Sequence, residues 1–201
     1  YHSRADEAQA LVVELEKLGA KAVMLQLDVG RSDSFGAFGT QVEQALQQQF
    51  ERQRFDFLVN NAGVGLHVSF AETTVEQFDM LMNVHFKGPF FLTQQLLSLI
   101  NDGGRIINVS SGLARFSIPG ASAYAAMKGA MEVLTRYQAK ELGSRQITVN
   151  TLAPGAIETD FGGGAVRDNS AVNAMVAENT ALGRAGQPAD IGGALAVLLS
   201  R

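Results

Sequence analysis

Short apolar runs alternate with segments of helical periodicity along this chain of 201 residues. Apolar side chains recur at helical spacing over residues 5–18, 34–50, 75–100 and 122–142, and a shorter helix is expected over 171–182. Between them lie four runs typical of buried strands: residues 22–27, 55–59, 105–109 and 147–152. This alternation requires right-handed crossovers between parallel strands. It therefore predicts an α/β fold of three layers, a doubly wound parallel sheet with helices on both faces. Gly88-Pro89 predicts a kink within 75–100.

The composition excludes several classes of protein. With 46% hydrophobic and 18% charged residues the chain is typical of a globular protein, and its length predicts one domain over residues 1–201. It has no cysteine, which excludes disulfides, thiolate metal sites and cysteine nucleophiles; we expect a cytoplasmic protein without a metal. A formal charge of −4 without a basic run argues against nucleic-acid binding. No run approaches 18 consecutive apolar residues, so we expect no membrane span.

Small or polar residues follow each predicted strand. They are Asp28-Val29, Asn60-Asn61-Ala62-Gly63, Ser110-Ser111-Gly112 and Ala153-Pro154-Gly155. Each group alone has the composition of an ordinary turn. In an open parallel sheet, however, ligands bind at the carboxyl ends of the strands. Four such groups at one edge therefore predict a ligand site there.

Ser111, Tyr124 and Lys128 are the candidate catalytic residues. Tyr124 and Lys128 are four residues apart in a predicted helix, which makes the phenol and the ammonium neighbours on one face. For proton transfer at neutral pH a tyrosine pKa must fall by about 3, or roughly 4 kcal/mol, and a nearby cation supplies a stabilisation of that order. By itself this pair is commonly a surface contact. A serine at the end of a strand facing the same cleft favours catalysis, because its hydroxyl can hold a carbonyl or an alkoxide.

Together these motifs resemble the short-chain dehydrogenase/reductase family over essentially the whole chain. The resemblance rests on Asn60-Asn61-Ala62-Gly63, Ser111, Tyr124 with Lys128, and Pro154-Gly155 followed by Thr159. Residues 147–155 look especially like the 3-oxoacyl-[acyl-carrier-protein] reductase branch. The resemblance implies a Rossmann-like oxidoreductase that transfers hydride between a nicotinamide coenzyme and a carbonyl or secondary alcohol, with reduction of a 3-oxoacyl or similar ketone expected. Tyr124 would be the general acid, Ser111 would position the carbonyl, and Lys128 would lower the tyrosine pKa and hold the nicotinamide ribose.

The resemblance also implies coenzyme contacts at the strand ends. Asp28 and Val29 would contact the adenine, and Asn60, Ala62 and Gly63 would line its ribose and the central strand. The residues that would border the nicotinamide are Tyr124, Lys128, Pro154, Gly155, Ile157 and Thr159.

The start of the chain bears on the choice of coenzyme. Tyr1 stands where NAD-preferring members of the family have an acidic residue, and Ser3 and Arg4 follow it. A hydroxyl and a guanidinium suit a phosphate, so we expect NADP(H) in preference to NAD(H).

The chain departs from the family pattern in two places. Three residues before Gly88, where the family has a catalytic asparagine, the chain has His85; Asn83 lies two residues earlier. In the family this position offers a main-chain carbonyl to a water on the proton path, which a histidine also provides, so His85 remains a candidate catalytic residue. The family's glycine-rich phosphate loop is absent from the 201 residues. We therefore expect a chain cut at both ends, lacking the first strand-helix unit and the last strand.

Other expectations concern the substrate and assembly. Residues 156–180 resemble the mobile substrate loop of the family. The helices over 75–100 and 122–142 resemble its dimer-forming pair, which implies a homodimer or homotetramer. Two alternative functions stay open. One is oxidation of a secondary alcohol such as a sugar or steroid, and the other is a weakly catalytic NAD(P)-binding regulatory protein.

Overall fold

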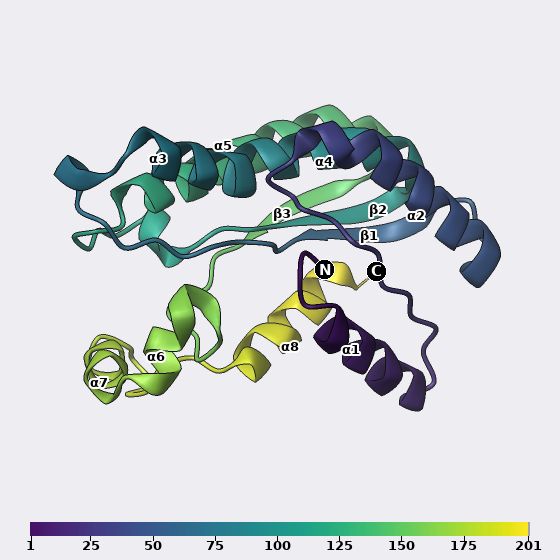
Figure 1. Cartoon of the computed structure of the whole chain (residues 1–201). Helices are drawn as coiled ribbons and strands as arrows, with labels where there is room; N and C mark the ends of the chain where they lie inside the picture. The colour runs from purple at the N-terminus through teal and green to yellow at the C-terminus, as the bar shows by residue number, and fades with distance from the viewer. Residues whose placement is uncertain (201) are drawn as a thin grey trace.

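The computed structural model describes residues 1–200 and has the predicted α/β architecture. One sheet contains three parallel strands in the order β1-β2-β3, which are Phe55–Asn60, Ile100–Val109 and Thr148–Leu152. Helices cover both faces, with α2, α4 and α5 above the sheet and α1 and α8 below it in Figure 1. The helices are α1 (Ala5–Lys17), α2 (Phe35–Phe50), α3 (Val75–Met82), α4 (Gly88–Leu96), α5 (Ser122–Leu142), α6 (Ala165–Asp168), α7 (Ser170–Glu178) and α8 (Pro188–Leu199). The predicted layers and the parallel sheet are confirmed.

The strand predicted over residues 22–27 is wrong. The segment runs between α1 and α2, and its backbone pairs only with the start of the chain: the Tyr1 amino group donates to Leu25 O at 2.9 Å and Leu27 N donates to Tyr1 O at 2.8 Å. Two bonds to a chain end do not make the evenly spaced ladder of a parallel pair. Leu27 nevertheless packs against the core, so the apolar pattern reflects partial burial without strand pairing.

The helix predicted over residues 75–100 is divided. It starts with a capping box, in which Thr74 Oγ1 accepts from Gln77 N and the Gln77 side chain accepts from Thr74 N. A π-helical turn, Asn83–Lys87, joins α3 to α4, so the irregularity comes just before the predicted kink. Pro89 lies in the first turn of α4, where a missing N–H disrupts no helical hydrogen bond. Gly88 is required because a Cβ there would collide with the carbonyl oxygen of Val29.

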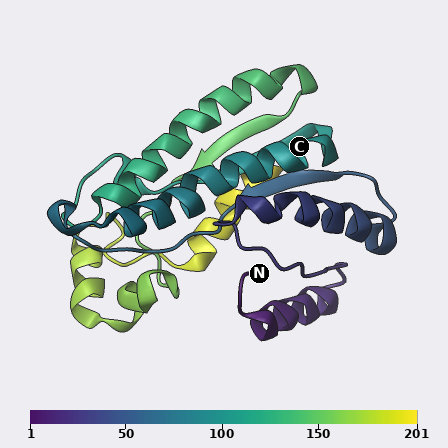
Figure 2. The same cartoon turned by 45° about the horizontal axis from the view of Figure 1, so that its top comes forward.

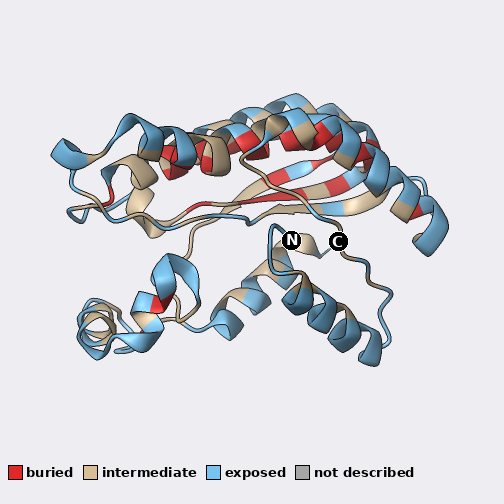
Figure 3. Ribbon diagram, viewed as in Figure 1, coloured by how far each residue is buried: buried red, intermediate tan, exposed pale blue. Residues whose placement is uncertain are grey.

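The hydrophobic core lies between the sheet and the upper helices (Figure 3). One cluster of buried side chains lies beneath α2 and α4 and contains Phe35, Leu92, Leu96 and Leu99. A second cluster contains Ile100 and Ile106 of β2, Val149 of β3 and Ile147, which directly precedes β3. Figure 2 shows α2, α4 and α5 side by side across this face. Below the sheet, by contrast, α1 and α8 contain no buried residue.

A polar network crosses the buried layer between sheet and helices. Its centre is Asn108 of β2, which is 0% exposed. Asn60 Nδ2 donates to Asn108 Oδ1 at 2.8 Å and to Thr93 Oγ1 at 3.0 Å. Asn108 Nδ2 donates to Thr135 Oγ1 and to Gln138 Oε1, both at 2.9 Å. The Asn60 side chain, expected at a coenzyme ribose, thus ties β1 to β2 and α4.

Two further features are absent from residues 1–200. None of their helices combines the length and apolar character needed to cross a bilayer. These residues also contain no group of three histidine or acidic side chains placed to hold a metal ion.

Candidate active site

The candidate catalytic side chains come together from three elements at the carboxyl edge of the sheet. Ser111 is the second residue after β2, and the chain there is held to the end of β3, since Ser110 N donates to Leu152 O at 2.8 Å and Gly112 N donates to Pro154 O at 2.9 Å. Tyr124 and Lys128 lie one turn apart in the first half of α5, and His85 lies in the π-helical turn. The sheet edge, α5 and the π-helical turn therefore build one site.

Tyr124 is mostly buried beside Ser111. Burial raises the pKa of its phenol above the ordinary value, and a hydrogen bond with Ser111 lowers it by less. This direction is opposite to the lowering expected from Lys128. The lysine Nζ lies over the tyrosine ring, 5.6 Å from its centroid. At neutral pH the phenol is therefore protonated and is able to act as an acid.

Lys128 is buried, with 5% of its surface exposed. Its Nζ donates to the Val109 carbonyl oxygen at 2.7 Å, and burial lowers its pKa from 10.5 to about 8. The Lys128 carbonyl in turn accepts from Ser110 Oγ at 3.1 Å, and that hydroxyl also lies 3.1 Å from Glu132 Oε1. The ammonium is therefore fixed at the strand end with a pKa close to neutral.

His85 is only 1% exposed and is held by the main chain of Val64. Its Nε2 lies 2.8 Å from Val64 O and 3.2 Å from Val64 N. Its ring meets Tyr124 edge to face, with centroids 5.0 Å apart and planes at 88°. Burial, and secondarily the charge of Lys128, lowers the His85 pKa to about 4, so the imidazole is neutral. Its Nδ1 is buried without a hydrogen-bond partner.

Glycine is required beside His85. A Cβ on Gly63 would lie 2.9 Å from His85 Cε1, closer than side chains tolerate. The motif Asn60-Asn61-Ala62-Gly63 therefore has two structural uses here: its first residue joins the core network, and its last makes room for the imidazole.

Of the residues expected at the adenosine end, Asp28 follows the segment 22–27, which is not a strand, and Arg4 lies near the chain start. Asp28 Oδ1 accepts from Gly30 N at 2.8 Å, and His2 Nε2 lies 3.5 Å from its other oxygen. Arg4 follows Ser3 directly before α1 and pairs with Glu7 at 2.7 Å and Asp160 at 3.1 Å. The guanidinium is thus held by carboxylates, all of them solvent-exposed.

The residues expected at the nicotinamide follow β3. Pro154 is fixed through its carbonyl by Gly112, and Ile157 bridges to Gly186. Thr159 Oγ1 accepts from Phe161 N at 3.2 Å. Gly155 has open space where a Cβ would stand, so this turn leaves room for a ligand.

Sequence reasoning did not identify three members of the site. The carbonyl of Val109 and the main chain of Val64 hold Lys128 and His85, and main-chain groups leave no mark in a sequence. Phe161 is the third, and its ring lies 5.9 Å from that of Tyr124. The neighbouring glycines 162–164 were the available signal, because such a run permits an unusual backbone path.

Known proteins of one family are similar to this chain over its whole length. A family model described as enoyl-(acyl carrier protein) reductase matches residues 1–201. A tetrahydroxynaphthalene reductase of Pestalotiopsis fici is 35% identical over 211 residues, which cover 100% of this chain and 74% of the relative. The crystal structure of the angucycline C-6 ketoreductase LanV with bound NADP is 36% identical, with a TM-score of 0.94 and coverage of 100% of this chain and 77% of that one. A short-chain dehydrogenase from Burkholderia cenocepacia J2315 in complex with NADP is 31% identical, with a TM-score of 0.89 and coverage of 100% and 78%.

Proposed function

Because this chain belongs to the short-chain dehydrogenase/reductase family, we propose that it reduces the ketone group of a small molecule with NADPH. The observation that carries the proposal is the protonated Tyr124 phenol beside the Ser111 hydroxyl and the buried Lys128 ammonium. A general acid for ketone reduction must hold its proton at working pH, and a phenol whose pKa is raised is protonated there. Relatives solved with NADP support the choice of coenzyme.

The residues at the sheet edge fit a nicotinamide coenzyme, which would supply the hydride. The open space at Gly155 and the unpartnered, buried Nδ1 of His85 are consistent with a polar ligand at this edge. The residues proposed to hold the coenzyme are Ser3, Arg4, Asp28, Val29, Asn60 through its main chain, Ala62, Gly63, Tyr124, Lys128, Pro154, Gly155, Ile157 and Thr159.

The proposed roles follow from what each side chain contacts. Ser111 orients the substrate carbonyl beside the phenol, and Tyr124 donates its proton to the carbonyl oxygen as that oxygen becomes an alkoxide. Lys128, 5.6 Å from the tyrosine ring centroid, stabilises the phenolate that remains. His85 is neutral and holds the 61–64 segment and the Tyr124 ring in place. We propose that residues 156–180 close over the substrate.

Coenzyme preference provides the direct test. We expect kcat/KM for ketone reduction to be at least about tenfold higher with NADPH than with NADH, because Arg4 can exchange its exposed carboxylate partners for a 2′-phosphate. Arg4→Ala should raise the KM for NADPH by about tenfold and leave that for NADH unchanged. Initial rates measured by absorbance of the reduced coenzyme give both values.

The matched control is Arg31→Ala, which removes another exposed arginine, one paired with Asp33 at 2.9 Å. An efficiency with NADH equal to that with NADPH would contradict the choice of coenzyme. Failure to oxidise either coenzyme with any ketone would contradict the proposed reductase activity.

Two substrate types are proposed for the assay. A 3-oxoacyl thioester follows from the resemblance of residues 147–155. A ring ketone is favoured by the relatives whose names specify tetrahydroxynaphthalene and angucycline. Both undergo the same balanced change, in which the carbonyl carbon gains a hydride and its oxygen gains a proton.

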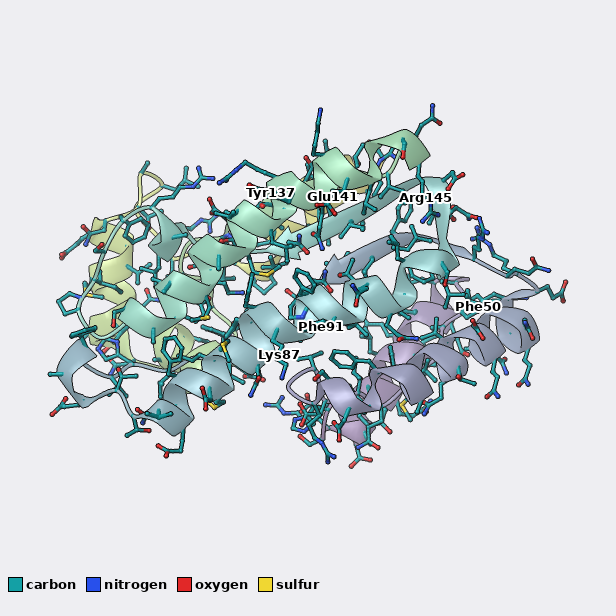
Figure 4. The ribbon with its side chains drawn as sticks, turned by 90° about the horizontal axis from the view of Figure 1, so that it is seen from above. Phe50, Lys87, Phe91, Tyr137, Glu141 and Arg145 are labelled. Carbon is teal, nitrogen blue, oxygen red and sulfur yellow. The ribbon has the colours of Figure 1, made fainter. Side chains whose placement is uncertain are left out.

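We also propose that the protein forms a homodimer or homotetramer through α4 and α5. Between these helices lies a groove of about 440 Å³ lined mainly by apolar side chains, which are Phe86, Phe90, Leu97, Val133, Leu134, Tyr137 and Leu142. Figure 4 looks down on this face, with Tyr137 and Glu141 on one helix and Phe91 on the other. Tyr137 is 64% exposed, and a contiguous exposed apolar patch commonly marks a protein interface.

Light scattering of the purified protein tests this assembly. We expect a mass of two or four times 21.4 kDa, and Val133→Glu should reduce it to that of a monomer because it places a charge in the groove. Leu18→Glu, at an exposed leucine outside the groove, should leave the mass unchanged. A monomeric wild-type protein would contradict the proposal.

A further inference from the structure

Tyr124 has two aromatic neighbours, one of which is buried and the other exposed. His85 meets it edge to face at 5.0 Å and is buried and held by Val64. On another side Phe161 lies 5.9 Å away, tilted by 53°, and 46% of its surface is exposed. The His85 ring is therefore buried and held in place, while the Phe161 ring lies near Tyr124 and is partly exposed to solvent.

Phe161 packs against the backbone of Gly65 and is followed by three glycines. The next three residues, Gly162, Gly163 and Gly164, have φ values of 62°, 72° and 75°, in the left-handed region that favours glycine. Gly65 lies close to this segment, because a Cβ on it would be 2.9 Å from Gly162 Cα and 3.3 Å from Phe161 Cε1. Any larger residue at position 65 would collide with this segment, so the Phe161 ring packs closely here because Gly65 has no side chain.

A second exposed ring, that of Phe116, lies against Gly112, the residue after Ser111. Phe116 is 57% exposed, and a Cβ on Gly112 would lie 2.8 Å from its Cε1. Gly112 directly follows Ser111, so this aromatic ring lies one residue along the chain from the group proposed to orient the carbonyl. The half-exposed rings of Phe161, beside Tyr124, and of Phe116, beside Gly112, offer faces on which a flat apolar ligand can stack.

The charges next to these rings are already paired. Asp160, which precedes Phe161, lies 2.6 Å from Arg167. Arg115, which precedes Phe116, lies 3.5 Å from Glu132. Around Phe161 and Phe116 the surface therefore offers a substrate aromatic ring faces more than unpaired charge.

We infer that Phe161 is a specificity-determining residue that selects ketones fused to an aromatic ring, which stack against it beside Tyr124. This inference rests on the proposed ketone reduction and names its substrate class. A flat ring gains stacking contact with Phe161, about two- to tenfold in affinity for one ring pair, whereas a saturated ring or an acyl chain has no such face.

The activity test compares two ketones of similar shape, 2-tetralone and 2-decalone. With NADPH we expect wild-type kcat/KM to be about tenfold higher for 2-tetralone. Phe161→Leu keeps an apolar side chain but has no ring, so it should lower kcat/KM for 2-tetralone by about five- to tenfold and for 2-decalone by less than about twofold. Phe161→Tyr should retain the preference, and Phe70→Leu, at an exposed phenylalanine on another turn, should behave as wild type.

A binding test without turnover separates this inference from the proposed activity. By calorimetry, 2-naphthol should bind the wild type about fivefold or more tighter than decahydro-2-naphthol, and Phe161→Leu should abolish the difference. Phe161-dependent binding without coenzyme oxidation would support the inference and overturn the reductase activity. Reduction of both ketones with a preference that Phe161→Leu leaves unchanged would overturn the inference alone. Absence of both effects would overturn both.

Discussion

Tyr124→Phe is expected to lower kcat for ketone reduction by about 10²- to 10⁴-fold, the usual contribution of a positioned general acid. The substitution removes only the hydroxyl that bonds with Ser111, and the ring still packs between His85 and Phe161. The loss should therefore fall on kcat, with little change in KM for the coenzyme or in the midpoint of thermal unfolding. Steady-state kinetics with NADPH and a ring ketone measure it.

Tyr137→Phe is the matched control, because it removes a hydroxyl from an exposed tyrosine of the same helix. It should retain wild-type kcat. A Tyr124→Phe enzyme within tenfold of wild type would show that another group supplies the proton. If the protein were instead an NAD(P)-binding regulatory protein, Tyr124→Phe would keep its ligand response, so binding of NADPH should be followed in parallel.

The second large effect concerns stability. Asn108→Leu is expected to lower the free energy of unfolding by about 3–5 kcal/mol, since it removes three buried hydrogen bonds and leaves partners such as Thr135 with less than their full set. Leucine has a similar volume, so the loss reflects the hydrogen bonds more than a cavity. Urea denaturation followed by circular dichroism gives the difference.

Asn101→Leu provides the comparison within the same strand. Asn101 is less buried and donates one side-chain hydrogen bond, to Asp56 at 2.9 Å, so its replacement should lower the free energy of unfolding by about 1 kcal/mol. Equal losses for the two variants would mean that the network around Asn108 adds nothing beyond a single bond.

Periodicity predicted an element well where the features that form it lie within its own residues. The helix over 122–142 is found at those residues, because its pattern of apolar positions and its length are local properties. Residues 22–27 show the limit. Their apolar composition fits a strand, but a strand also needs a neighbour with which to pair, and composition holds no information on that partner.

The proximity of the candidate residues was predictable from the sequence, and their electrostatics less so. Helical spacing made Tyr124 and Lys128 neighbours, as found. The tyrosine pKa is raised, opposite to the predicted lowering, because burial of the phenol outweighs the effect of Lys128, whose Nζ donates to the Val109 carbonyl. Burial depends on all the residues packed around the phenol, which helical spacing does not reveal. Arg4 shows the same limit, since its partner Asp160 lies 156 residues away in the chain.

The π-helical turn Asn83–Lys87 makes the site depend on the number of residues in a helix as well as on their kinds. A π-helical turn holds one residue more than an α-helical turn, so deletion of one residue from it would let α3 run into α4 as a regular helix and would shift the direction of the side chains within the turn. His85 would then leave Val64 and the edge of Tyr124. Point substitutions can exchange the side chain at this position, but only an insertion or a deletion can redirect it.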